Sequence, residues 1–133
     1  MLRTLTVPTA KRTEMIDVTD RVQGLVRDSN VRDGCVLCYV PHTTAGITIQ
    51  ENADPDVVAD VLYKLEALAP RSDPRYRHGE GNSDAHIKAS LVGSSVLVPV
   101  RDSSLVLGTW QAIYFCEFDG PRSRSLHVQL LAG

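Results

Sequence analysis

From residue 95 to its end, the chain consists of extended segments in which apolar side chains recur at every second position, as at 113 and 115 and at 126, 128 and 130, and this pattern limits the possible folds more than any other feature. Side chains of a strand point alternately to opposite faces, so the alternation predicts strands with one buried face. We expect four extended segments here: Ser95 to Val100, Ser104 to Leu107, Thr109 to Phe118 and Arg122 to Leu131. The Asp119-Gly120 pair is typical of a tight turn, which predicts that the last two segments form a hairpin.

The predicted hairpin would bring charged side chains to one end of an apolar sheet face. With a two-residue turn, Glu117 lies opposite Arg122, and Phe115 lies opposite Arg124. The carboxylate and the two guanidiniums can form a structural ion-pair network at the sheet margin. Alternatively, the two arginines can clamp a phosphorylated or carboxylated ligand in bidentate fashion.

The N-terminal part predicts further strands and a short helix. Leu5 and Val7 alternate with threonines in a first strand, and residues 15–18 read as its hairpin partner. A short helix is expected to open at Thr19. Residues 34–41 and 45–51 complete the expected strands of this half.

The most clearly marked helix spans Pro55 to Leu68. Asp54 is a typical capping residue, proline is favoured at the first helical position, and Pro70 lies beyond the end. Residues 70–82 show no periodicity and many polar side chains. Loops of this length are often functional or mobile.

A short segment after this loop concentrates groups that carry chemistry. His78, Glu80, Asp84 and His86 lie within nine residues, and His86 falls in the first turn of a predicted short helix that Asn82 or Ser83 can cap. Imidazole and carboxylate form the donor set of zinc and similar divalent ions. A helix N-terminus followed by Lys88 instead favours an anion such as phosphate.

Other candidate site residues are spread along the chain, and each has a structural alternative. His42 follows a predicted strand and can join the other histidines or be an ordinary surface histidine. Glu51 can be a general base or can bond backbone amides near Asp54. Trp110 and Gln111 can stack on and hydrogen-bond a flat heterocycle, or the tryptophan can pack in a core or an interface.

Composition and charge exclude several classes of protein. A chain of 133 residues fits one domain, and we expect a single domain over residues 1–133. The net charge of −2 and the basic residues, which are scattered except at Arg122 and Arg124, argue against a nucleic-acid partner. No apolar run approaches the roughly 20 residues of a membrane span, and the N-terminus lacks the apolar core of a signal peptide, so we expect a cytoplasmic protein.

The three cysteines, an odd number, argue against a disulfide framework. Cys35 and Cys38 resemble a zinc knuckle in spacing, but on a strand their side chains point to opposite faces. We interpret them and Cys116 as buried structural thiols.

Several segments, taken in chain order, together resemble the YjbQ-like family, whose members are described as secondary thiamine-phosphate synthases. The resemblance spans nearly the whole chain. It is carried by His42–Gly46, Glu51–Pro55, His78–Ser90, Gly108–Gln111 and Glu117.

The resemblance implies a compact α+β domain dominated by a mostly antiparallel β-sandwich with two to three helices, assembled as a homotrimer. It also implies a histidine-lined cleft that can hold a divalent metal ion, zinc or magnesium, with His42, His78 and His86 as ligands. The implied catalytic residues are Glu51, Glu80, Lys88 and Glu117. The implied substrate-binding residues are Trp110, Gln111, Arg122 and Arg124, of which Arg122 lies in a segment that varies within the family.

The family activity implies an enzyme acting on small phosphorylated molecules. It joins hydroxymethylpyrimidine diphosphate to a thiazole phosphate and releases diphosphate. Because this activity is described as secondary, the physiological substrate can differ. Two alternatives stay open: a metal-dependent hydrolase of a small phosphorylated or acyl substrate, and a non-catalytic metabolite-binding trimer.

Overall fold

Two antiparallel sheets pack face to face, and their inward-facing side chains form the core. The computed structural model describes all residues, 1–133. The larger sheet has the strand order β1-β8-β3-β5-β6, and the smaller has the order β2-β7-β4. The strands are β1 (Leu2–Pro8), β2 (Glu14–Asp17), β3 (Gly34–Tyr39), β4 (Ala45–Glu51), β5 (Ser95–Arg101), β6 (Ser104–Leu105), β7 (Gln111–Glu117) and β8 (Ser123–Ala132).

The core between the sheets consists of the apolar members of the alternating strands. Ile113 and Phe115 of β7 meet Leu126 and Val128 of β8 there, all fully buried. The period-2 pattern of β8 therefore predicted its buried face correctly, whereas β7 is buried on both faces because α3 covers the side of Ala112, Tyr114 and Cys116. Burying such side chains is the main favourable contribution to folding. The expected α+β fold with a mostly antiparallel sandwich is confirmed.

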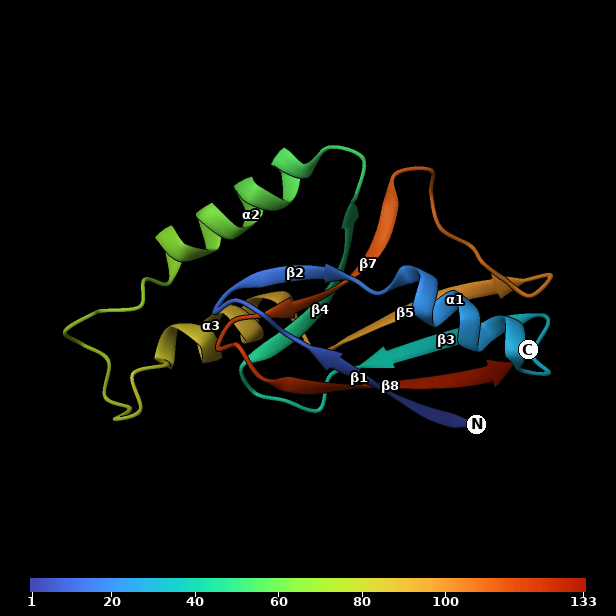
Figure 1. Cartoon of the computed structure of the whole chain (residues 1–133), viewed down its shortest axis with the longest axis horizontal. Coiled ribbons are helices and arrows are strands. Elements are labelled where there is room, and N and C mark those ends of the chain that lie inside the picture. Colours follow the sequence, from blue (N-terminus) through green and yellow to red (C-terminus); the bar gives the residue numbers. More distant parts are fainter.

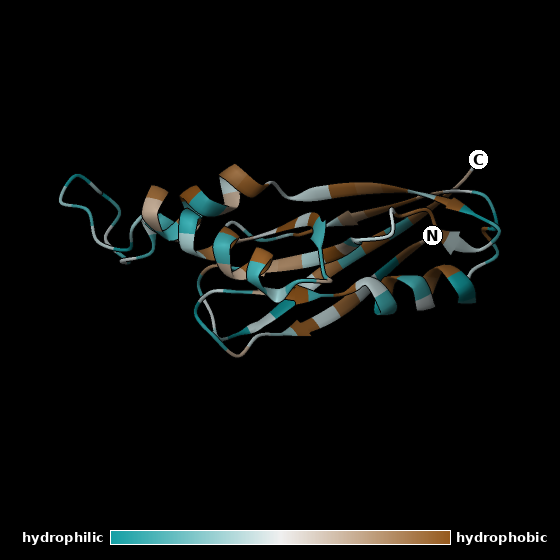
Figure 2. Ribbon diagram, turned by 90° about the horizontal axis from the view of Figure 1, so that it is seen from above, coloured by the Kyte–Doolittle hydropathy of each residue, from teal (hydrophilic) through white to brown (hydrophobic).

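Three helices surround the sheets: α1 (Thr19–Asp28), α2 (Pro55–Leu68) and α3 (Ser83–Val92). Val22 and Val26 of α1 extend the sandwich core. Ala85 and Ala89 of α3 pack with Tyr114 on the other face of the smaller sheet. The termini lie at one end of the molecule, and the α2–α3 loop lies at the other (Figure 1). That loop is hydrophilic along most of its length (Figure 2).

Helix α2 has the predicted bounds but projects from the body of the chain (Figure 1). The Asp54 side chain caps it by accepting the Asp56 N–H at 2.9 Å, as its position predicts. None of its side chains is fully buried, and Tyr63 and Leu68 are 73% and 65% exposed. Much of its apolar surface therefore lacks a partner within one chain. None of the three helices has the length and apolar character needed to span a membrane.

Both predicted hairpins are wrong. Strand β1 pairs with β8, whereas β2 pairs with β7, so these neighbours in sequence lie in different sheets. After β7, the chain likewise crosses from the smaller sheet to the larger before β8 begins, so Arg122 and Arg124 do not lie opposite Glu117 and Phe115. Alternation shows which face of a strand is buried but does not identify the strand beside it.

A glycine in β4 brings α3 close to the smaller sheet. A Cβ on Gly46 would lie 2.7 Å from the Gly93 carbonyl oxygen at the end of α3. The neighbouring Ile47 N–H donates a hydrogen bond of 3.0 Å to the same oxygen. The absence of a side chain at residue 46 thus lets the last turn of α3 dock on the sheet edge.

All three cysteines are free. Cys38 and Cys116 are buried, as predicted, and burial raises the pKa of each thiol to about 12. Cys35 faces the other side of β3 and is only partly buried, so its predicted full burial is wrong.

Candidate functional site

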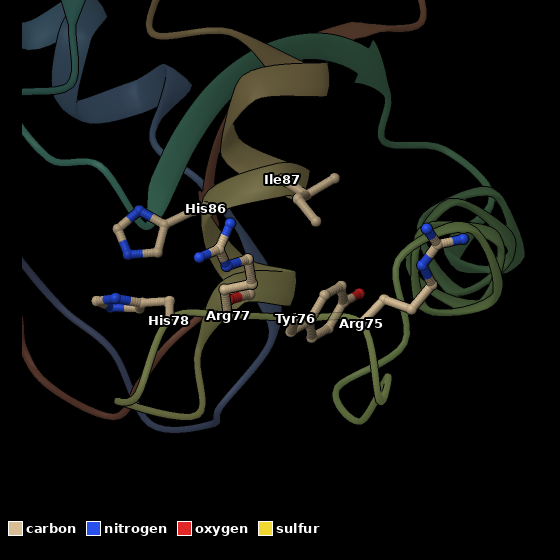
Figure 3. Close-up of a pocket in the computed structure, with 7 residues that line it drawn as sticks. Arg75, Tyr76, Arg77, His78, His86 and Ile87 are labelled. Atoms are coloured by element: carbon tan, nitrogen blue, oxygen red, sulfur yellow. The ribbon is translucent and has the colours of Figure 1, made fainter.

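Three hollows meet at the end of the sandwich that carries α3, and all three are lined by His86. A polar hollow of about 380 Å³ lies between the segment after β3, the start of α3 and the segment after β7. A second hollow contains His42 and the C-terminal turn of α3, and a third contains the residues before α3 (Figure 3). The polar hollow is lined by Thr43, Thr44, Glu80, Asn82, His86, Asp119 and Arg122.

His42 lies in this region, as predicted, with a fixed ring orientation. Its Nε2 atom accepts the Ser125 backbone N–H at 3.0 Å. Burial, and next the nearby Arg124 guanidinium, lowers the pKa of His42 below its ordinary value. The ring is therefore held neutral near pH 7, with the proton on Nδ1.

A buried ion pair between Glu117 and Arg124 lies close to His42. The Arg124 Nε atom donates to Glu117 Oε1 at 2.9 Å, and its Nη2 atom donates to the Thr44 hydroxyl at 2.8 Å. Glu117 and Arg124 are 0% and 3% exposed. The geometry matches the structural ion pair that the sequence left open, and these donors of Arg124 are already engaged within the protein.

His78 and His86 lie side by side, as the spacing suggested. Their ring centroids are 5.4 Å apart in an edge-to-face arrangement, and Glu80 Oε2 lies 3.8 Å from His78 Nε2. Within this one chain, however, no three His, Cys, Asp or Glu side chains converge closely enough to hold a metal ion. His42 also uses Nε2 for the Ser125 amide, so the three imidazoles do not fit one ion in this arrangement.

Lys88 lies inside the protein rather than in a hollow. Its side chain is 1% exposed, and its ammonium group forms an ion pair with Glu66 of α2 and donates to Asp84 Oδ2 at 3.2 Å. Asp84 also accepts from Arg12 Nη2 at 3.1 Å. This network ties α2, α3 and the β1–β2 loop together, and it accounts structurally for Lys88 and Asp84.

Arg122 lines the polar hollow and is half exposed. Its Nη2 atom donates to Asp119 Oδ2 at 3.0 Å, and Asn82 donates to the same carboxylate oxygen at 2.8 Å. Asn82 thus occupies the cap position of α3, as predicted, but its side chain bonds Asp119 instead of the helix. Of the two arginines in the predicted clamp, only Arg122 faces this hollow.

Glu51, Trp110 and Gln111 lie at the opposite end of the smaller sheet. In the register of β4 and β7, Ala45 pairs with Glu117 and Glu51 pairs with Gln111. Six residues of strand separate these pairs by roughly 20 Å. Glu51 accepts the Asp54 N–H at 3.2 Å, which is the structural alternative expected for it. Trp110 is 61% exposed and packs in no core of this chain.

The hollows also contain residues that the sequence analysis did not single out. The threonines at 43 and 44 follow His42 directly, and Arg75, Tyr76 and Arg77 precede His78. The sequence did contain a signal for these residues, because one arginine lies on each side of Tyr76, directly before the candidate ligand His78.

Comparisons with known proteins agree with this architecture. The model of the family described as UPF0047 protein YjbQ-like matches residues 3–133. UPF0047 protein YugU of Bacillus subtilis is 50% identical over 131 residues, covering 98% of this chain and 99% of the relative. UPF0047 protein MJ1081 of Methanocaldococcus jannaschii is 49% identical over 131 residues, covering 98% of this chain and 94% of the relative.

Solved structures share the fold at comparable similarity. A YjbQ/UPF0047 family protein from Clostridium acetobutylicum has a TM-score of 0.94 at 49% identity, covering 97% of this chain and 99% of that one. A Sulfolobus solfataricus protein has a TM-score of 0.94 at 33% identity, covering 100% of this chain and 97% of that one.

Proposed function

Because the chain belongs to the UPF0047 family of YjbQ-like proteins, we propose that it is a transferase acting on small phosphorylated heterocycles. Thiamine phosphate synthesis from hydroxymethylpyrimidine diphosphate and a thiazole phosphate is the activity we expect to be measurable. The observation that carries this proposal is the position of His86 as a common wall of three hollows. A transfer reaction needs two substrates on adjoining sites, and this arrangement provides room for both.

In the proposed reaction, the bond between the pyrimidine methylene carbon and the diphosphate oxygen breaks, and its electron pair leaves with diphosphate. The thiazole nitrogen then forms the new C–N bond with its lone pair. Arg122 and the Thr43 hydroxyl can donate hydrogen bonds to the departing diphosphate. The Thr44 hydroxyl accepts from Arg124, so its own proton also remains available to donate. An imidazole at residue 86 can give or take a proton.

The cationic pyrimidine formed by this bond cleavage needs stabilisation. Glu117 is enclosed by hydrogen-bond donors from Arg124, Thr9 and Asp119. We therefore assign the stabilising role to Glu80, which is exposed and lines the same hollow as His86. Its carboxylate can lie near developing positive charge.

A homotrimer forms part of this proposal. Glu51, Trp110 and Gln111 are remote from His86 within one chain, so a substrate-stacking role for Trp110 requires a neighbouring subunit. The exposed apolar side chains of α2, with Trp110 itself, support such contacts because monomeric proteins rarely leave large apolar patches uncovered. Light scattering at micromolar concentration tests this part, and a monomer would remove it.

A divalent metal ion, zinc or magnesium, is also part of the proposal, with His78 and His86 as the residues that would bind it. His78 and His86 would supply two adjacent imidazoles, and because no third donor converges on them within one chain, the remaining ligands would come from the substrate or a neighbouring subunit. When bound, such an ion would stabilise negative charge on phosphate oxygens. Elemental analysis of the purified protein and of the His78→Ala variant tests this part, and an equal metal content in both would contradict it.

The deciding experiment incubates the protein with both heterocycles and measures thiamine phosphate by mass spectrometry. We expect His86→Gln to lower turnover by about 100-fold, in the range typical for loss of a general acid or base. His127→Gln is the matched control, because His127 of β8 bonds Thr4 of the neighbouring strand β1 and lines none of the hollows. An unaltered rate in His86→Gln would overturn the proposal.

The same assay distinguishes the alternatives. Release of diphosphate or phosphate without the coupled product would favour a hydrolase. Substrate binding by calorimetry, with no product of either kind, would favour a metabolite-binding protein.

A further inference from the structure

We propose that Arg75 and Arg77 form a phosphate-binding site beside His78 and His86, suited to a small molecule with a phosphate group and a flat ring. Assigning that molecule as the second substrate of the transferase rests on the proposed function. The binding site itself does not, because it is formed by the loop before α3 and the first residues of α3.

The site has the shape of a small-ligand pocket. The hollow measures about 450 Å³ and is lined by Arg75, Tyr76, Arg77, His78, Ser83, His86 and Ile87. In Figure 3 the Arg77 guanidinium lies between the His86 ring and Ile87, and Arg75 stands on the far side of Tyr76. The side chains of two arginines and two histidines thus line one hollow, whose volume is within the usual size range of ligand pockets.

The two arginines are cations without anionic partners. Arg12, Arg122 and Arg124 each form an ion pair with a carboxylate, but Arg75 and Arg77 form none. The carboxylates around them are already engaged, with Glu66 and Asp84 on Lys88, Asp73 on the Arg75 backbone and Glu80 nearest His78. A phosphate would therefore meet free guanidiniums, which bind phosphate oxygens in bidentate fashion.

The backbone that carries the arginines is fixed before any ligand binds. Asp73 accepts the Arg75 N–H through its side chain at 2.9 Å and the Tyr76 N–H through its carbonyl at 3.0 Å. The Tyr76 hydroxyl donates to the Pro70 carbonyl at 2.8 Å and closes the loop. A loop ordered in this way loses less conformational entropy on binding than a free loop would.

The remaining wall of the hollow suits a ring rather than a polyanion. Ile87 of α3 is 39% exposed and lines the hollow, and the Tyr76 ring lies near it (Figure 3). These apolar surfaces can pack against the faces of a heterocycle. The net charge of −2 also gives a long polyanion no overall attraction to the chain.

The test uses inorganic phosphate as the probe and the ring protons of the four histidines as reporters in NMR titrations. We expect saturable shifts for His78 and His86, and none for His127, which lies on β8 and bonds Thr4 of β1 outside the hollows. Arg75→Gln/Arg77→Gln should weaken phosphate binding by at least tenfold, because each guanidinium contributes charge-assisted hydrogen bonds. Arg101→Gln, at an exposed arginine outside the hollows, is the matched control and should bind as the wild type does.

The outcomes distinguish a failure of the phosphate site from a failure of the proposed transferase. Unsaturable or uniform shifts of all four histidines, or equal affinity in the double variant and the control, would overturn the phosphate site whatever the enzyme assay shows. Saturable binding that the double variant loses, in a protein that makes no thiamine phosphate, would support the site and overturn the proposed transferase.

Discussion

Glu117 and Arg124 form a buried ion pair that joins the two sheets, although their strands are not neighbours in either sheet. Burial alone would raise the pKa of Glu117, but hydrogen bonds from Arg124, the Asp119 amide and the Thr9 hydroxyl outweigh it and hold the pKa below its usual value. Arg124 also bonds both oxygens of Thr44. The pair thereby fixes the segment that begins at His42.

Removing one member of this buried ion pair should cost more stability than replacing both members by apolar residues. Glu117→Leu leaves a buried guanidinium without its carboxylate and should lower the free energy of unfolding by about 3–5 kcal/mol. The double variant Glu117→Leu/Arg124→Leu should lose less than Glu117→Leu alone. Urea denaturation measures both, with Arg122→Gln as the exposed control at about 1 kcal/mol or less. Additive losses in the double variant would contradict this account.

His42 should make stability depend on pH. Its pKa is lowered in the folded protein, so between that value and the ordinary pKa of about 6.5 the unfolded chain binds more protons. Stability should therefore fall as pH drops below about 6.5 and level off below the folded pKa. Denaturation midpoints measured from pH 5 to 8 should fall less in His42→Gln than in the wild type. An equal pH dependence in the two proteins would refute the assignment.

Lys88 should contribute to the stability of the fold rather than to catalysis. Lys88→Met leaves the buried Asp84 with Arg12 as its only ion-pair partner and should cost roughly 3 kcal/mol. Lys64→Met, at an exposed position of α2, should change stability by about 0.5 kcal/mol or less. A Lys88 variant with an unchanged unfolding midpoint and no turnover would assign the lysine to catalysis instead.

Two glycines should respond to alanine in opposite directions. Gly46→Ala places a Cβ 2.7 Å from the Gly93 carbonyl oxygen and should destabilise the fold by about 1–3 kcal/mol. Gly24 lies within α1 with no atom near its would-be Cβ, so Gly24→Ala should stabilise by roughly 0.5–1 kcal/mol. Thermal unfolding midpoints compare the two. A stable Gly46→Ala protein would contradict the close docking of α3.

The thiols should differ in reactivity. Burial raises the pKa of Cys38 and Cys116 to about 12, which leaves almost no thiolate at pH 8. Cys35 is partly exposed and should be the one thiol that reacts rapidly with a disulfide reagent in the native protein. All three should react in denaturant. Rapid reaction of a second native thiol would contradict this prediction.

Much of the secondary structure could be read from local signals. Asp54, Pro55 and Pro70 marked the limits of α2, and alternation marked the buried face of β8. These signals act over a few residues, through capping, fixed backbone angles and the period of side chains. Strand partners could not be read in this way, because any two half-buried strands present similar patterns.

The sequence by itself determined which elements form, which faces they bury, and that chemistry-bearing side chains gather near His78 and His86. Only the tertiary structure decided that Glu117 binds Arg124 between the sheets, that Lys88 is enclosed by carboxylates, and that Arg75 and Arg77 remain unpaired beside the histidines. The physical reason is that secondary structure follows from neighbours along the chain. The partner of a charged group instead depends on distant segments, which folding brings together in space.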